Sequence, residues 1–260
     1  MSNTTTDRQS SQSAIRLLQI MECLSKNRVP TRLQDLAKQV KMTQSTVLRY
    51  LYTLQDENYV YQEADTLRYA LTWRVCGLSE NVNSLLSLRN ITTPFINHLA
   101  NIFHTGTCLV INEGNECVYL DCIVDSNASL QYIGKRAPLH VTGSGKVLLA
   151  QYNDVQLNDY IETKGLAKLT EYTIIDATAL RKELEKIRSQ DYGMDEEECE
   201  IGLRCISFPL RDYSGHVIAA VSVFGCIEDM SDHRIKDEIR PALKEAAATI
   251  STRLGYRPEK

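Results

Sequence analysis

Residues 143–146, Gly-Ser-Gly-Lys, invite comparison with the loops that bind nucleotide phosphates. A P-loop needs a glycine five residues before its second glycine and a Ser or Thr directly after the lysine. This chain has His140 and Val147 at those positions, which excludes a P-loop. The glycines can still start a helix whose free N–H groups hold an anion such as a carboxylate. A tight turn that needs glycine only for packing is the alternative.

A dense acidic run occupies residues 195–200, Asp-Glu-Glu-Glu-Cys-Glu, and offers side chains for general acid–base catalysis. No His partner, Ser-His-Asp order or metal-ligand spacing accompanies it, so a solvated loop or helix start is the simpler interpretation. Cys205 begins an expected strand and Ser222 lies on the next one. Cys205 is therefore either a reactive thiol or, as is commoner for buried thiols, an inert one. His140 is expected only to satisfy the turn before Gly143.

Eight cysteines occur without a Cys-x-x-Cys pair, at positions 23, 76, 108, 117, 122, 199, 205 and 226. Their spacing does not match the common zinc sites, so we expect no metal and no other cofactor. The chain starts with MSNTTTDRQSSQ, which lacks the apolar segment of an export signal, and no apolar run reaches the roughly 18 residues of a membrane span. We therefore expect a cytoplasmic protein without membrane association, whose cysteines are reduced and mostly buried thiols.

Three helical patterns and a hairpin pattern precede these residues. Apolar side chains recur at helical spacing over residues 14–24, with Ser13 as the expected N-cap. A second helix is predicted from Thr31, which has capping-box spacing to a glutamine, and a third from about Thr43. Two short strands then flank a polar turn over residues 59–71. Three short helices followed by a hairpin predict a winged helix-turn-helix, whose third helix fits the major groove of DNA.

The charge of the chain is divided unevenly. Residues 1–55 hold eight Lys/Arg and three Asp/Glu, a balance of +5, so the remainder carries −9 of the total of −4. A basic domain joined to an acidic one suits a polyanion binder. The candidate DNA contacts lie on the outward face of the third helix and on the wing, and they are Thr43, Gln44, Ser45, Thr46, Arg49, Tyr50 and Arg68. Polar surface residues of a small bundle, or a winged helix that binds only protein, are the alternatives.

The remaining pattern predicts a second, larger domain of helices and strands in the order α-βββ-ααα-ββ-α. Its helices are expected at residues 90–103, 142–152, 155–163, 177–190 and 231–254, the last with a kink or restart at Pro241. Its strands are expected at 107–112, 117–123, 129–135, 205–211 and 217–224. Consecutive hairpins without βαβ alternation predict an α+β fold with an antiparallel sheet and flanking helices. The domains would be a disordered tail (1–12), a winged helix-turn-helix (13–73), a linker helix (74–90) and the second domain (91–260).

Longer segments of the sequence resemble the IclR family of bacterial transcription regulators. The family's recognition helix and wing resemble STVLRYLYTLQDENYV and LRYALTWRV. The effector-site helix and the longest family signature resemble IGKRAPLHVTGSGKVLLA and RSQDYGMDEEECEIGLRCISFPLRDYSGHVIAAVSVFG. The resemblance implies a GAF-like sensor domain that binds a small organic or sugar acid. By position, the implied effector-binding residues are Gly143, Ser144, Asp195, Cys205 and Ser222.

Two positions depart from the family pattern. Phe224 replaces a serine found in some members, which suggests an effector larger or less polar than a two-carbon acid. Leu67 stands in the wing turn where glycine is usual. The resemblance further implies double-stranded operator DNA as a partner and a homodimer or homotetramer. A thiol-based redox sensor with the same DNA-binding half, and an enzyme with Cys205 as nucleophile, are the competing hypotheses.

Overall fold

The chain is described by a computed structural model that covers residues 11–27, 29–76, 78, 88–124 and 132–258. Contacts within the chain divide it into two compact units, Met1–Leu85 and Leu86–Lys260. Each unit has a hydrophobic core of its own.

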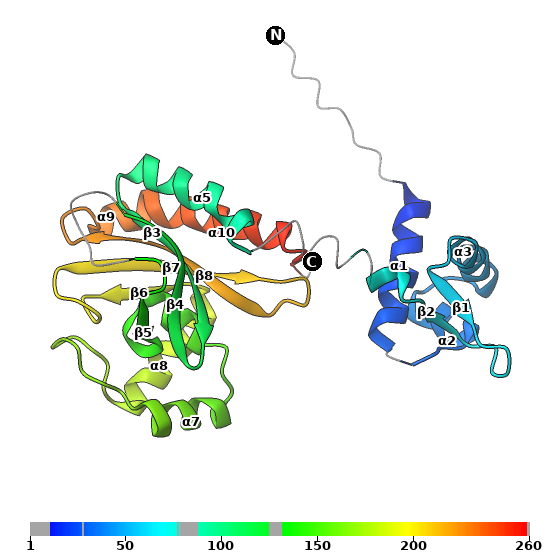
Figure 1. Cartoon of the computed structure of the whole chain (residues 1–260), viewed down its shortest axis with the longest axis horizontal. Helices are drawn as coiled ribbons and strands as arrows, with labels where there is room; N and C mark the ends of the chain where they lie inside the picture. The colour runs from blue at the N-terminus through cyan, green and yellow to red at the C-terminus, as the bar shows by residue number, and fades with distance from the viewer. Residues whose placement is uncertain (1–10, 28, 77, 79–87, 125–131, 259–260) are drawn as a thin grey trace, which may run out of the picture. The chain divides into compact units, whose positions relative to one another are not determined.

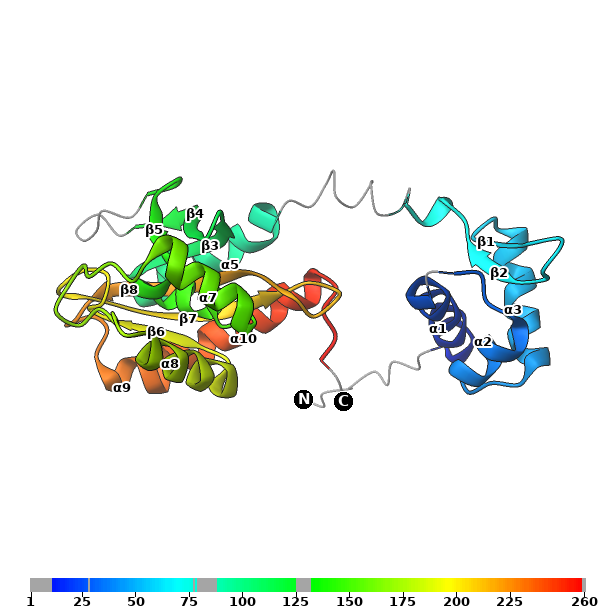
Figure 2. The same ribbon diagram turned by 90° about the horizontal axis from the view of Figure 1, so that it is seen from below.

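The described part of the first unit includes three helices and a hairpin, which are labelled in Figure 2. They are α1 (Gln12–Asn27), α2 (Leu33–Gln39), α3 (Gln44–Asp56), β1 (Val60–Gln62) and β2 (Tyr69–Leu71). Ile20, Leu36 and Leu51, one from each helix, meet in its core with no exposed surface. The helices and the antiparallel hairpin β1–β2 confirm the predicted winged helix-turn-helix arrangement.

The predicted helix starts were right for one helix and wrong for two. Thr43 caps α3, and its hydroxyl accepts a hydrogen bond from the N–H of Thr46 at 3.3 Å. Helix α1 already begins at Gln12, inside the expected disordered tail and ahead of the expected cap. Thr31 does not cap α2, because its backbone pairs with Tyr69 through two N–H···O bonds of 2.9 Å. The backbone pairing of Thr31 with Tyr69 of the wing takes the place of the capping box that the sequence spacing suggested.

The second unit is built on one six-stranded antiparallel sheet, in the order β5-β4-β3-β8-β7-β6. Its strands are β3 (Gly106–Glu113), β4 (Glu116–Ile123), β5 (Arg136–Pro138), β6 (Gly193–Glu196), β7 (Leu203–Arg211) and β8 (Val217–Cys226). The hairpin β3–β4 turns at Gly114 and Asn115, both with positive φ, as a two-residue turn requires.

Helices cover both faces of this sheet (Figure 1). Helices α5 (Leu88–Phe103) and α10 (Arg240–Arg253) pack on one face. On the other lie the short 3₁₀ turn Leu139–Val141, α6 (Gly143–Leu149), α7 (Asp154–Lys164) and α8 (Ala177–Gln190). This two-sided packing confirms the predicted α+β class with flanking helices, and it places α6 directly against the central strands.

Three predictions for this unit need correction. The strand expected at 129–135 is instead β5, and residues 129–131 lie outside the described residues. Strand β6 was not predicted, since its second half falls in the acidic run. The final helix is interrupted by one π-helical turn, Ile235–Ile239, between α9 (Asp232–Arg234) and α10, next to the expected break at Pro241. Most of the expected linker helix also falls outside the described residues, and residues 88–90 belong to α5.

The expectation that all cysteines are reduced was wrong for one pair. Cys108 of β3 and Cys122 of β4 face each other in the antiparallel register and are joined by a disulfide, with 4.3 Å between their Cα atoms. The sequence gives no spacing that marks this pair, since the register of the hairpin brings the two residues together. The other six cysteines are free. Only Cys117 and Cys205 among them are buried, while Cys76 is exposed and the remaining three are half-buried, so the expectation that most thiols are buried was wrong.

Candidate functional site

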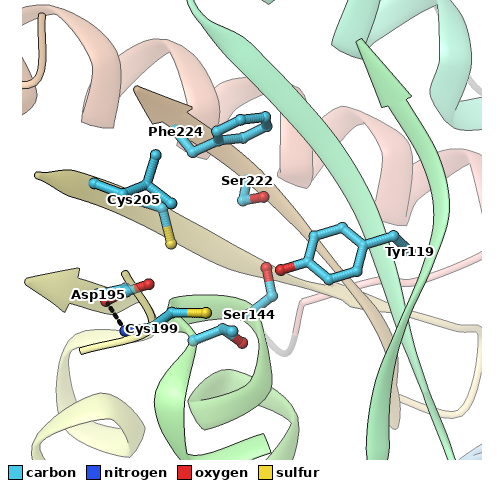
Figure 3. A pocket seen from close by; sticks show the side chains of 9 residues that line it. Tyr119, Ser144, Asp195, Cys199, Cys205, Ser222 and Phe224 are labelled. Carbon is cyan, nitrogen blue, oxygen red and sulfur yellow. Dashed lines mark hydrogen bonds between the residues drawn. The ribbon is translucent and has the colours of Figure 1, made fainter. Parts of the chain in front are cut away.

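A small pocket lies between the start of α6 and the sheet of the second unit (Figure 3). The register of the sheet places Asp195, Cys205 and Phe224 opposite one another on β6, β7 and β8. Four of the five predicted effector residues line the pocket, and they are Ser144, Asp195, Cys205 and Ser222. The other lining residues are Tyr119, Thr142, Cys199, Leu203 and Phe224.

Gly143, the fifth predicted residue, is a packing residue behind this wall. A Cβ atom at Gly143 would lie 2.9 Å from Sγ of Cys205 and 3.2 Å from the carbonyl oxygen of Gly193. Any side chain there would push α6 away from the sheet. The N–H of Gly143 donates to Sγ of Cys205, and the N–H of Gly145 donates to the hydroxyl of Thr142 at 2.9 Å. Two N–H groups of the helix start therefore already have partners within the protein.

Asp195 is the acidic residue of the pocket and is only 2% exposed. Its Oδ1 accepts hydrogen bonds from the backbone N–H groups of Glu198 (2.8 Å) and Cys199 (3.3 Å). Burial, and next the nearby Glu198 carboxylate, raise the pKa of Asp195 to about 7, although Lys146 and the two N–H groups favour its charged form. The group can thus accept or, when protonated, donate a hydrogen bond near neutral pH.

Lys146 contacts the acidic run outside the pocket lining. It is 1% exposed, and its Nζ pairs with Oε1 of Glu198 and lies 3.7 Å from Oε1 of Glu183 on α8. Burial raises the pKa of Glu198, against the effect of Lys146, and Oε2 of Glu198 has no partner in the described part of the chain. The lysine that looked like part of a phosphate loop therefore ties α6 to the acidic run. The sequence showed both partners but not their distance.

Phe224 forms part of the pocket wall. Its ring lies on Gly106, the residue opposite it on β3, where a Cβ would be 2.2 Å from the ring. Glycine at position 106 is therefore what admits the aromatic side chain. The remaining free volume is about 10 Å³, close to the smallest space that holds one water molecule. An effector larger than one water molecule therefore requires side chains to move.

The thiols and the histidine of this region are not arranged as a nucleophile and its base. Burial raises the pKa of Cys199 to about 12 and that of Cys205 even further above its usual value. His140 is fully buried, with Nδ1 2.9 Å from the Tyr160 hydroxyl and Nε2 3.1 Å from the Ala167 carbonyl. Burial lowers the pKa of His140, so it is a neutral structural residue, as the sequence suggested.

The structure exposes most, but not all, of the predicted DNA contacts. Thr43, Gln44, Ser45 and Arg49 are exposed on α3 or at its cap, and Thr46 is half-buried beside Thr43. Tyr50 was expected to face outward but is 7% exposed and belongs to the core of the first unit. The expected outward position of Tyr50 was therefore wrong, because the buried face of α3 is wider than its aliphatic residues alone indicated.

Arg68 and Leu67 define the wing. Arg68 is half-buried beside Thr31 and Asp35 rather than extended from the hairpin, and its Nε has no partner among the described residues. Leu67 takes a left-handed backbone with φ of +56°, the conformation for which glycine is usual. Leu67 therefore adopts the left-handed backbone conformation that a glycine usually adopts at this position.

Among the described residues, no group of three or more His, Cys, Asp or Glu side chains is placed to hold a metal ion. None of the described helices combines the length and the apolar character needed to cross a membrane.

Both units match known protein families. Residues 13–64 match the IclR helix-turn-helix domain, and residues 81–252 match the family described as "Bacterial transcriptional regulator IclR C-terminal". The HTH-type transcriptional regulator KdgR of Escherichia coli is 32% identical over 261 residues, which covers 98% of each chain.

Solved structures agree. The IclR structure of Thermotoga maritima is 28% identical and has a TM-score of 0.62, covering 94% of this chain and 99% of that one. A double mutant of the inducer-binding domain of PobR from Acinetobacter, in complex with 3-hydroxybenzoic acid, is 27% identical with a TM-score of 0.60, covering 64% and 98%. From the motifs, the fold and these matches over nearly its whole length, the chain belongs to the IclR family of bacterial transcription regulators.

Proposed function

We propose that this protein binds a specific double-stranded DNA operator through α3 and that a small organic or sugar acid in the pocket of the second unit controls its affinity for that operator. The observation that carries the proposal is the pocket itself. Residues of four strands and of the start of α6 line it, and together they bring one carboxyl group, four hydroxyls and two thiols to the same pocket. The same chain carries a helix-turn-helix domain.

The DNA-binding half is supported by the exposed residues of α3. Gln44, Ser45 and Arg49 lie on the surface of the helix that a winged helix-turn-helix inserts into the major groove. Arg49 can bind a guanine edge through two hydrogen bonds, and the basic balance of residues 1–55 attracts phosphates. Because one recognition helix makes few base contacts, we propose that a homodimer or homotetramer reads paired half-sites.

The effector half is supported by the polar lining and by a relative. The similar PobR domain was solved with 3-hydroxybenzoic acid, which is an organic acid. In the present pocket Asp195 offers a hydrogen-bonding partner for an effector hydroxyl, while Ser144 and Ser222 offer hydroxyl groups. Buried thiols with raised pKa values favour binding over catalysis, so we propose that Cys205 is a pocket wall and not a nucleophile.

The DNA-binding half is tested by selecting bound sequences from a random DNA pool and measuring affinity for the selected site. Arg49→Ala should weaken binding by about 1–3 kcal/mol, the value of one good bidentate base contact. Lys244→Ala, which removes an exposed cation of the second unit, is the charge-matched control and should leave affinity unchanged. Equal affinities of wild type and Arg49→Ala would exclude Arg49 from the DNA interface.

The effector half is tested by a thermal-shift screen of keto, hydroxy, sugar and aromatic acids on the full chain. An acid present at 100 times its Kd should stabilise the second unit by roughly 2.7 kcal/mol. Asp195→Ala and Ser222→Ala should remove that stabilisation. An acid that stabilises both variants as strongly as the wild type would show that the pocket is misplaced.

A further inference from the structure

Tyr119 brings an unused hydroxyl group into the pocket. It lies on β4, where its backbone is fixed by the bonds Tyr119 N–H to Lys135 O (3.1 Å) and Gly134 N–H to Tyr119 O (2.8 Å). The residue is 7% exposed, and Figure 3 shows its phenol directed into the pocket toward Ser144. Within the described part of the chain, no residue forms a hydrogen bond with the phenol oxygen.

A hydroxyl that faces a pocket takes its hydrogen-bond partner from whatever enters the pocket, a water molecule or a ligand group. The Ser144 hydroxyl is not that partner, because it pairs with the Ser207 hydroxyl at 2.9 Å. Burial, and next the neighbouring thiols of Cys117, Cys199 and Cys205, raise the pKa of Tyr119 above its usual value, so the phenol keeps its proton and remains a donor. An acceptor on a bound ligand can therefore take the hydrogen bond of the phenol.

The charges of the lining suggest which acceptor this is. None of the nine lining residues is a lysine or an arginine, so a bound carboxylate must be held by neutral donors. The helix start supplies few of these, since the N–H groups of Gly143 and Gly145 already have partners. Asp195 lies on the side of the pocket away from Tyr119 (Figure 3) and would repel a carboxylate placed beside it.

We propose that Tyr119 is a specificity-determining residue of the effector pocket, whose hydroxyl donates a hydrogen bond to the carboxylate of the bound acid. Asp195, on the opposite side, then takes the hydroxyl of the acid. This inference rests on the proposed function, because it assumes that the pocket binds an acid. It assigns the charged end of the ligand to a residue outside the set expected from the family resemblance.

The test uses Tyr119→Phe, which keeps the ring and removes only the hydroxyl, in the full chain. Tyr132→Phe, at an exposed tyrosine outside the pocket lining, is the matched control. Lactate, glycerate, gluconate and 3-hydroxybenzoate are the probes, each with its uncharged amide, and Kd is measured by calorimetry. For the acid that binds the wild type most tightly, Tyr119→Phe should raise Kd by about tenfold to a hundredfold, the effect of losing a hydrogen bond to a charged group.

Comparing each acid with its amide distinguishes the loss of a specific hydrogen bond to the carboxylate from general damage to the pocket. Tyr119→Phe should weaken binding of the amide much less than binding of the acid, so the preference for the acid falls. Incorporation of 3,5-difluorotyrosine at position 119, whose phenol is a stronger donor, should tighten acid binding. This second variant decides the matter if Tyr119→Phe does not fold.

Each remaining outcome has one meaning. If an acid binds wild type and Tyr119→Phe equally, or if the difluorotyrosine protein binds it no more tightly, the inference fails while the proposed function stands. If the acid and its amide lose affinity equally in Tyr119→Phe, the carboxylate assignment is wrong. If no probe binds the wild type, the proposed acid effector fails, and the inference fails with it.

Discussion

Asp195 is a buried carboxyl group whose pKa is set by opposing influences. Burial and Glu198 favour its neutral form, while Lys146 and two backbone N–H groups favour its charged form, and the result is a pKa of about 7. The sequence resemblance indicated Asp195 as a pocket residue. It did not show the titration, because that depends on how deeply the acidic run is buried and on where Lys146 lies.

The first prediction concerns the pH dependence of stability. The pKa of Asp195 is about 7 in the folded protein and about 3.9 when unfolded. The folded state therefore binds the extra proton, and this group's contribution to the free energy of unfolding is lost as pH rises from about 4 to about 7. Asp195→Asn should raise the thermal midpoint of the full chain more at pH 8 than at pH 5. An equal shift at both pH values would contradict the assigned pKa.

The second prediction concerns Leu67 in the wing turn. Its left-handed backbone costs a non-glycine residue roughly 1–2 kcal/mol, and the side chain is 63% exposed, so little burial is lost on removal. After the entropic penalty of glycine, Leu67→Gly should stabilise the first unit by up to about 1 kcal/mol. Calorimetric unfolding measures this. Ala64→Gly in the same turn, without a left-handed backbone, should instead destabilise it.

At the scale of elements, α6 and the acidic run act as one piece because Lys146 and Glu198 pair across them in a buried site. Helices and hairpins with clear periodicity, such as α3, α8 and β3–β4, could be predicted from the sequence. Strand β6 could not, because Asp195 and Glu196 look like surface residues until β7 pairs with them. Strand β5 is only three residues long and has too little alternation to be recognised.

The third prediction tests that buried pair. Lys146→Met leaves the Glu198 carboxylate buried without its cation and should destabilise the second unit by about 3–5 kcal/mol. Lys186→Met is the control, because Lys186 also lies 3.7 Å from Glu183 but is exposed, so its loss should change stability by less than about 1 kcal/mol. Adding Glu198→Leu to Lys146→Met should restore part of the loss. Urea unfolding of the full chain that gave equal losses for both lysine variants would contradict the role of Lys146.

The fourth prediction tests the link between β3 and β4. Because Cys108 and Cys122 are joined, the denatured protein should take up six alkyl groups without a reductant and eight after reduction, as shown by intact mass.

The free thiols also bear on the redox-sensor hypothesis. They include buried residues with raised pKa values, so mild peroxide should leave operator binding intact. Operator binding that peroxide abolishes and a reductant restores would favour the redox-sensor hypothesis.

At the scale of the whole molecule, the two units divide the work between a recognition helix and a ligand pocket. The basic balance of residues 1–55 and the acidic balance of the remainder were visible in the sequence, and the order of the elements predicted both folds. Four of the five expected pocket residues line the cavity, but Tyr119 was missed. Side chains two residues apart on a strand lie on the same face of the sheet, so Tyr119 shares the buried face of β4 with Cys117. This alternation is visible in the sequence, but it does not show that Tyr119 reaches a ligand pocket.

Control of DNA affinity by the pocket is measured by titrating the full-length protein onto its selected DNA site. Fluorescence anisotropy gives the DNA Kd with and without a saturating acid from the thermal-shift screen. We expect the acid to change the DNA Kd by about 5-fold to 150-fold, the usual range of coupling between two sites. Ser222→Ala should reduce that change while leaving the DNA Kd without acid unaltered. An acid that binds the pocket and leaves the DNA Kd unchanged would show that the pocket does not control DNA binding.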